Sequence, residues 1–376
     1  MRAVFRVASI ALAAVVALGL AGVPKDAAAA EKYKIYLSMS FIGNDWQAEA
    51  ANMVKAMAAH KSLADKVDLK VQVAGPNAQR QIQQINAMVQ AGADAIVIFP
   101  ISPTALNSVV KNACAKGVLV FAYDAAISEP CAYNISIDQL EAGRVTAEWL
   151  VKKLDGKGDI IVITGVPGIS VDTMRTQAAK EVFAKHPGIK IIGESVGMWS
   201  QAVARTELSK ILATRKWDQV DGLWMQVGCY TANAMQLEAG KTEKDLVPCA
   251  GEGANGGRVQ MLPIGTEVEG ANGAYRPMAA PRISYASPPY SGGLALKMAV
   301  RKLDGGDVPK QITLPLPIVT SETIKLCGEG TWVEMKAGCN AFLPSLVPNP
   351  GWFASIYSSE TPEIGLGAAL VGEPES

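Results

Sequence analysis

Short apolar segments alternate along the chain with segments whose apolar residues recur at helical spacing. The short segments, such as residues 93–100 and 117–125, are near-continuous runs of apolar residues, which is typical of parallel strands buried on both faces. Segments such as residues 77–92 lie between them and have the pattern of amphipathic helices. The alternation predicts repeated βαβ units, and therefore parallel sheets with helices on both faces.

The same alternation occurs twice, which predicts two doubly wound α/β domains with a ligand cleft between them. The expected strands of the two series are residues 33–39, 67–73, 93–100 and 117–125, followed by 159–164, 189–196, 220–226 and 246–250. A strand at 282–287, a helix at 290–303 and an extended segment at 312–320 follow the second series and need a sheet to join. Their return to the first domain would make three crossings between the domains, which is a hinge.

These elements set the expected organisation of the chain. We place a signal peptide at residues 1–30, an N-terminal lobe at 31–138 plus about 283–315, a C-terminal lobe at 139–282, and a hinge crossing with a C-terminal extension at 316–376. The signal peptide rests on Arg2 and Arg6, an apolar run, and the small residues 27–30 before Glu31. An uncleaved membrane anchor is the alternative interpretation. Cleavage near Ala30 predicts a periplasmic protein.

Composition narrows the range of partners. The chain has 376 residues, of which 49% are hydrophobic and 19% charged, as expected for a folded protein. Its 35 Lys and Arg balance its 35 Asp and Glu, so no global field attracts nucleic acid or an anionic membrane. Two histidines leave little room for histidine-dependent catalysis. We therefore expect a small neutral ligand, no cofactor, no metal and no nucleic acid.

Export changes the interpretation of the six cysteines. In an oxidising compartment, Cys114 with Cys131 and Cys327 with Cys339 are expected to form local disulfides. Cys229 and Cys249 either pair or stay free, and the sequence alone does not distinguish these cases.

Polar and aromatic residues follow most of the predicted strands, where ligands of open α/β sheets bind. The candidate ligand-binding residues are Asn44, Trp46, Gln47, Tyr123, Asp124, Arg175, Trp199, Gln226, Glu252 and Asn255. Carboxylate, guanidinium and amide groups bond vicinal hydroxyls, and aromatic rings pack against the C–H face of a sugar. Six of them have an ordinary structural alternative. It is a helix cap for Asn44 or Glu252, a helix cap or a solvated loop acid for Asp124, a surface salt bridge for Arg175, and core packing for Trp46 or Trp199.

In the order of its motifs, the sequence resembles the exported sugar-binding proteins of bacterial ABC importers, of the ribose- and galactose-binding kind. The motifs are residues 43–46, 83–96, 100–102, 117–124 and 165–170 followed by Arg175. The resemblance implies the type I periplasmic binding fold, with Asn44, Asp124 and Arg175 bonded to sugar hydroxyls and Trp46 and Trp199 as aromatic walls. The sequence departs from the family pattern: Gln47 stands where the family has a second aromatic residue, and Ala286-Ser287 stands where it often has a glutamine.

Two further functions compete with capture of a sugar or polyol for an ABC permease by a monomeric binding protein. An exported sugar-active enzyme would need a general base and a reactive group at the strand ends, and the chain offers carboxylates without such a partner. A sensory module would present its closed form to a membrane receptor. The pattern Gly251-x-Gly253-x-x-Gly256 matches a dinucleotide fingerprint, but it lies in the last loop of the second domain rather than in its first βαβ unit.

Overall fold

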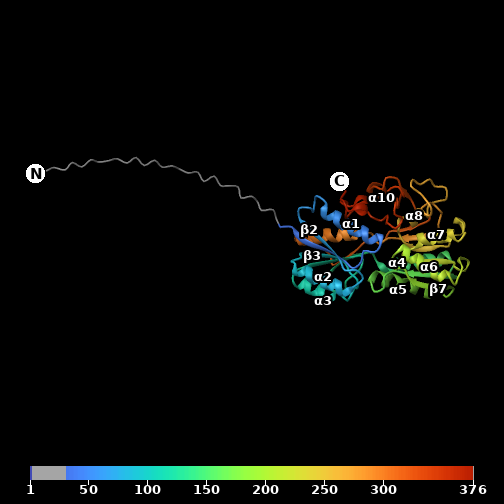
Figure 1. The fold of residues 1–376 in the computed structure, drawn as a ribbon, viewed down its shortest axis with the longest axis horizontal. Coiled ribbons are helices and arrows are strands. Elements are labelled where there is room, and N and C mark those ends of the chain that lie inside the picture. The colour runs from blue at the N-terminus through green and yellow to red at the C-terminus, as the bar shows by residue number, and fades with distance from the viewer. Residues whose placement is uncertain (2–30, 376) are drawn as a thin grey trace. The chain divides into compact units, whose positions relative to one another are not determined.

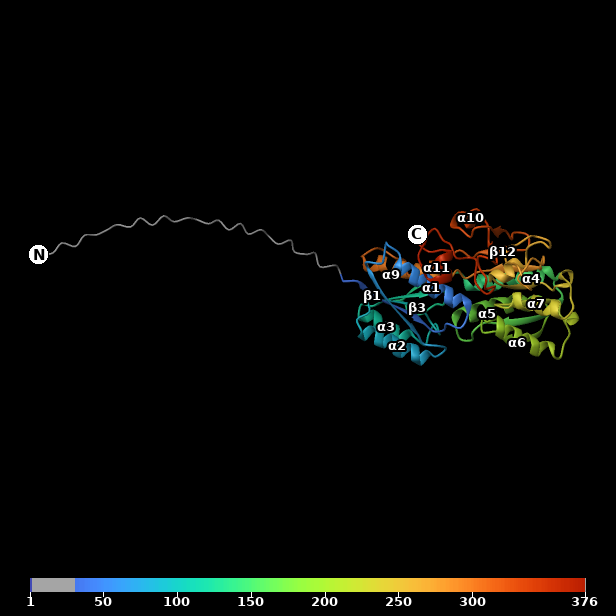
Figure 2. The same cartoon turned by 45° about the horizontal axis from the view of Figure 1, so that its top comes forward.

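The computed structural model describes Met1 and residues 31–375, and the residues from Lys32 onward form one compact unit (Figure 1). Apart from Met1, the predicted signal peptide lies outside the described residues. Two six-stranded sheets, each covered by helices on both faces, form the body of this unit. Figure 2 shows the same elements from a second direction.

The first sheet contains six strands in the order β11-β5-β4-β3-β1-β2, and every neighbouring pair is parallel. The strands are β1 Tyr33–Met39, β2 Val67–Val73, β3 Ala95–Phe99, β4 Leu119–Tyr123, β5 Tyr133–Ser136 and β11 Gln311–Thr313. β5 was not expected as a strand. Its alternating burial places Asn134 and Ser136 in partly exposed positions, and this polar alternation resembles a loop in sequence.

Side-chain alternation along the first sheet divides its apolar residues between two helical layers. Ile35, Leu37 and Met39 pack with α1 and α9, whereas Tyr36 packs in the cluster that includes α2 and α3. The helices are α1 Asp45–Ala59, α2 Ala78–Gln90, α3 Asn107–Ala115 and α9 Ser291–Leu303.

The second sheet has the order β12-β10-β9-β8-β6-β7, in which only the β10–β12 pair is antiparallel. Its strands are β6 Gly158–Thr164, β7 Ile189–Val196, β8 Gly222–Met225, β9 Cys249–Glu252, β10 Arg282–Tyr285 and β12 Ile318–Thr320. Helices α4 and α5 share one apolar cluster, and α6 and α7 share another. The helices that accompany this sheet are α4 Gln139–Lys153, α5 Ser170–Ala184, α6 Gln201–Leu212, α7 Cys229–Glu238 and α8 Asn255–Val259, with 3-10 turns at Trp217–Gln219 and Glu243–Asp245.

The chain passes between the two sheets three times, between β5 and α4, between β10 and α9, and between β11 and β12. The predicted doubly wound fold with a three-crossing hinge is therefore confirmed. One expected boundary shifts. The N-terminal lobe was expected to resume near residue 283, but Ile283 and Ser284 pair with Ala250 and Gly251 of β9. The return to the first sheet therefore begins after Tyr285.

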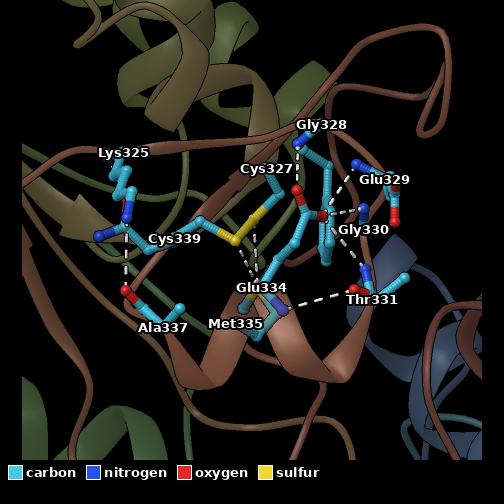
Figure 3. Close-up of a disulfide and its surroundings, with 12 residues drawn as sticks. Lys325, Cys327, Gly328, Glu329, Gly330, Thr331, Glu334, Met335, Ala337 and Cys339 are labelled. Carbon is cyan, nitrogen blue, oxygen red and sulfur yellow. Dashed lines mark hydrogen bonds between the residues drawn. A yellow bond between two sulfur atoms is a disulfide. The ribbon is translucent and has the colours of Figure 1, made fainter.

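The C-terminal extension, residues 321–376, contains short helices and strands of its own. Its elements are β13 Leu326–Cys327, α10 Trp332–Lys336, β14 Ala341–Phe342 and α11 Leu366–Val371, and β13 pairs with β14. Figure 3 shows the loop before α10, where the Glu334 carboxylate accepts the backbone N–H groups of Gly328, Glu329 and Gly330 at 2.8–2.9 Å. These bonds organise the turn that leads into α10.

All six cysteines are paired in disulfides. The predicted bonds Cys114–Cys131 and Cys327–Cys339 are present, and Cys229 is bonded to Cys249, which answers the question that the sequence left open. This third bond joins the start of α7 to the start of β9 within the second lobe. None of the helices in the described part of the chain is long and apolar enough to cross a membrane.

Candidate functional site

A cavity of about 450 Å³ lies where the carboxyl ends of strands from both sheets meet the C-terminal extension. The last residues of β3 and β9, together with the loops and helices that follow β1, β4, β6, β7 and β8, supply its walls. The lining residues are Ile42, Gly43, Asn44, Asp45, Trp46, Gln47, Phe99, Asp124, Val171, Arg175, Trp199, Ser200, Gln201, Ala202, Val227, Glu252, Gly351 and Phe353. This position is where ligands of open α/β sheets bind.

Asp124 follows β4 directly and has a left-handed backbone, with φ of 57°, which Asp tolerates better than most residues. Its carboxylate accepts a hydrogen bond from the Ser287 hydroxyl and another from Gln139 Nε2 at 3.0 Å. Burial raises the pKa of Asp124, while Arg175 and these hydrogen bonds oppose the rise. Asp124 is therefore a fixed acceptor in the cavity wall.

Arg175 lies in α5 and is only 1% exposed, so the alternative of a surface salt bridge does not apply. Its Nε donates to Gln139 Oε1 at 2.8 Å, and its Nη2 donates to Ser287 Oγ at 2.9 Å. The guanidinium also lies 4.9 Å from the centre of the Tyr285 ring, within the range of a cation–π contact. These contacts hold the cation in one position.

Gln139 and Ser287 connect the two lobes because each bonds both Asp124 and Arg175. Gln139 is the first residue of α4, just after the first crossing, and Ser287 lies in the second crossing. The charged groups of the two lobes are thus joined through the hinge itself. Neither hinge residue was expected in this role, although the Ala286-Ser287 departure from the family pattern marked one of the positions.

Glu252 ends β9, and its Oε1 lies 3.4 Å from Arg175 Nη1. Burial raises the pKa of Glu252 to about 7, although the neighbouring Arg175 lowers it. Near neutral pH this carboxyl is therefore present in both protonation states. It can accept a hydrogen bond from a ligand hydroxyl, or donate one when protonated.

The indole rings of Trp46 and Trp199 line the cavity with their N–H groups already bonded. Trp46 Nε1 donates to the Ser287 carbonyl at 2.7 Å, and Trp199 Nε1 donates to Gln226 Oε1 at 2.7 Å. Because the polar edge of each ring is satisfied by protein, the remaining contacts of these rings with a ligand are apolar.

Asn44 and Gln47 lie on the loop and first turn after β1. Asn44 caps α1, since its Oδ1 accepts the Gln47 backbone N–H at 2.9 Å, so the capping alternative is correct for that atom. The side chain of Gln47 is buried, and its Oε1 has no hydrogen-bond partner among the described residues. A buried unpaired acceptor beside a cavity is suited to a ligand donor.

Three predicted site residues do not line the cavity. Tyr123 packs in the core against the rings of Trp46 and Phe99, with centroid distances of 6.4 and 5.8 Å. Gln226 lies behind Trp199, where its Nε2 donates to Asp172 Oδ1 at 2.8 Å. The Asn255 side chain turns toward the C-terminal extension and donates to the Phe342 carbonyl at 3.0 Å.

Sequence reasoning did not find Phe99, Gln201, Gly351 and Phe353, which line the cavity. Phe99 ends β3, so its place at the shared strand edge was a usable signal. Gln201 begins α6, one residue after its Ser200 cap, and carried a weaker signal of the same kind. Nothing in the local sequence indicated that Gly351 and Phe353 of the extension reach the cleft.

The site combines hydrogen-bonding groups with aromatic rings, and it contains no histidine. In residues 31–375, no cluster of three or more His, Cys, Asp or Glu side chains is arranged to hold a metal ion. Asp124 accepts a bond from the Ser287 hydroxyl, whose oxygen in turn accepts one from Arg175, and Glu252 lies beside Arg175, so both carboxyl groups belong to one bonded network. The arrangement is suited to holding a polar ligand in a fixed orientation.

Comparison with known proteins identifies the class to which this fold and site belong. A family model described as the periplasmic binding protein domain matches residues 35–307, and the chain belongs to that family. The family resemblance inferred from the motifs is thereby confirmed. The match ends before the C-terminal extension.

Individual relatives are binding proteins. The chain is 27% identical to the xylitol-binding protein of Mycolicibacterium smegmatis over 289 residues, which cover 76% of each chain. It is 26% identical over 183 residues to the galactofuranose-binding protein of Escherichia coli, a match that spans 47% of this chain and 56% of that protein. A solved ABC transporter solute-binding protein from Thermobispora bispora is 27% identical, with a TM-score of 0.64 over 78% of this chain and 87% of that chain.

Proposed function

We propose that the protein captures a neutral sugar or polyol between its lobes by hinge closure and delivers it to an ABC permease. The observation that carries the proposal is the network in which Asp124 of one lobe and Arg175 of the other meet through Gln139 and Ser287 at the wall of a cavity. Bonds from one ligand to both lobes stabilise the closed arrangement by their differential affinity for it.

The chemistry of the cavity favours a polyhydroxylated ligand. Hydroxyl groups both donate and accept, so they match the carboxylates of Asp124 and Glu252, the free acceptor of Gln47 and the donors of Arg175. The rings of Trp46 and Trp199 suit the C–H face of such a molecule. The charge of Arg175 is compensated by neighbouring carboxyl groups, among them Asp124 and Glu252, so no free cation in the lining favours an anionic ligand.

The relatives support the same class of ligand, since two of them are named for binding xylitol and galactofuranose. A periplasmic location, reached by cleavage near Ala30, is consistent with the family, and so is a permease as partner of a monomeric binding protein. The site residues that we assign to the ligand are the seven predicted residues that line the cavity: Asn44, Trp46, Gln47, Asp124, Arg175, Trp199 and Glu252.

The test begins with a thermal-shift screen of the full chain against xylitol, other pentitols, tetritols, pentoses and hexoses. A bound ligand raises the melting temperature by mass action. Calorimetry of the best probe is then repeated with Asp124→Asn, which keeps the shape of the side chain and removes its charge. Loss of a charge-assisted bond predicts weaker binding by roughly ten- to a hundredfold.

Asp94→Asn is the matched control. Asp94 belongs to the same lobe and accepts the Lys34 backbone N–H at 2.7 Å, but it precedes β3 at the opposite edge of the sheet. Its substitution is expected to leave the affinity unchanged. Equal affinities of Asp124→Asn and wild type would contradict the assignment of the site, and a sugar recovered in altered chemical form would favour the enzyme alternative.

A further inference from the structure

The C-terminal extension is held by both lobes of the protein. In Figure 1 it lies over α1 of the first lobe and extends toward α8 of the second. On the first lobe, Asn52 Nδ2 of α1 donates to the Ala369 carbonyl at 3.0 Å. On the second lobe, the Tyr275 hydroxyl donates to the Val347 carbonyl at 2.8 Å. The chain therefore crosses between the lobes a fourth time within this extension.

The second lobe holds the crossing through its backbone. The Asn255 N–H donates to the Trp352 carbonyl at 2.6 Å, and the Gly256 N–H donates to the Pro350 carbonyl at 2.8 Å. An isolated antiparallel bridge joins Ala254 to Phe353. Both donors lie at the start of α8, where backbone N–H groups have no partner within the helix.

The first lobe holds the same five residues, 349–353, through two acidic side chains of α1. Both carboxylate oxygens of Glu49 accept the Phe353 backbone N–H at 3.0 Å, and Asp45 Oδ1 accepts a bond from Asn349 Nδ2 at 2.7 Å. Glu49 is only 1% exposed, so this contact is shielded from water. The fourth crossing is thus fixed from both sides.

This crossing lies at the ligand cavity, because Gly351 and Phe353 line it together with Asp124 and Arg175. Gly351 packs closely against Asp45: a Cβ atom there would lie 1.9 Å from Asp45 Oδ2, so a larger residue would displace the carboxylate that holds Asn349. Phe353 is 4% exposed and adds another aromatic ring to a lining that already contains Trp46, Phe99 and Trp199. The family match ends at residue 307, so the extension supplies a part of the site that the matched domain does not contain.

We propose that residues 349–353 form a fixed wall of the ligand site and that Phe353 is a specificity-determining residue that contacts the bound sugar or polyol. Glu49 acts as a positioning residue through the Phe353 backbone. The inference rests on the proposed function. It predicts that the C–H face of the ligand packs against a ring supplied by the extension.

The test is calorimetry with xylitol and with any stronger probe from the screen, using wild type, Phe353→Leu and the matched control Phe342→Leu. Phe342 is a buried phenylalanine of the same extension, but it does not line the cavity. Phe353→Leu is expected to weaken binding by roughly three- to tenfold, the scale of an aromatic contact. Phe342→Leu is expected to lower the melting temperature and leave the affinity unchanged.

Hydrogen exchange supplies a readout that needs no ligand. The Phe353 amide of the free protein is expected to be protected, and Glu49→Gln is expected to speed its exchange and to change the relative affinities among the probes. A freely exchanging Phe353 amide would overturn the fixed wall. Equal affinities of Phe353→Leu and Phe342→Leu would overturn the role of the ring while the proposed function stands. A wild type that binds no probe would overturn both.

Discussion

The ionisation of Glu252 is expected to be visible in the stability of the whole protein. Burial at the end of β9 raises its pKa from 4.5 to about 7, against the opposing effect of Arg175. In the unfolded chain the carboxyl titrates near its ordinary value, so between these two pH values the folded protein keeps a proton that the unfolded chain has lost. The free energy of unfolding therefore falls as the pH rises through this window.

The magnitude follows from the size of the shift. A pKa moved from 4.5 to about 7 corresponds to about 3 kcal/mol of differential stability. Glu252→Gln retains a polar side chain of similar shape but has no proton to lose. Relative to wild type, the variant is therefore expected to gain about 3 kcal/mol of unfolding free energy between pH of about 4.5 and pH of about 8.

The assay is urea denaturation of wild type and Glu252→Gln across this pH range, followed by tryptophan fluorescence. The difference in unfolding free energy between the two proteins is free of contributions from groups that titrate in both. Glu334→Gln serves as a control, because backbone N–H groups lower the pKa of Glu334, so its titration lies below this range and its difference from wild type is expected not to change with pH. A difference between Glu252→Gln and wild type that does not change with pH would refute the reasoning.

Three further predictions concern packing and covalent links. Gly143→Ala would place a Cβ 2.2 Å from the Arg175 carbonyl oxygen and so push α4 away from α5. The variant is expected to lose about 1–3 kcal/mol of unfolding free energy in denaturation and to bind ligand more weakly. Undiminished stability would contradict this contact. Replacing both Cys229 and Cys249 by Ser is expected to lower stability by about 3 kcal/mol in the chain-entropy model, and an unchanged melting temperature would argue against the bond. Leu37→Ala, in the middle of β1, should cost about 2–5 kcal/mol by calorimetric unfolding, with a small loss indicating a loosely packed first lobe.

The strand-end residues of the site could be predicted because their position follows from a regular pattern. Asp124 and Glu252 end or follow buried parallel strands, and such ends share one edge of each sheet. The same reasoning could not tell which of two adjacent residues at a strand end faces the ligand. Tyr123 precedes Asp124 by one residue, but it belongs to the strand and packs in the core, whereas the left-handed backbone of Asp124 is where the chain leaves the sheet.

Residues that meet through tertiary contacts were beyond the reach of sequence patterns. Gln226 directly follows β8, where a ligand-binding residue is expected, yet its amide holds Trp199 and Asp172 in place. Ser287 has its role only because the second crossing brings it to Asp124. The approach of Phe353 to the cavity depends on Glu49, which is 304 positions away in the chain.

That separation has a consequence for the order in which the protein folds. Contacts between distant residues form late, because a long loop must close before they contribute any stability. Both lobes must be in place before Glu49 and the start of α8 can receive the segment between them. The binding cavity is therefore expected to be the last part of the molecule to mature, with sugar affinity appearing in a slower refolding phase than the burial of tryptophan in the two sheets.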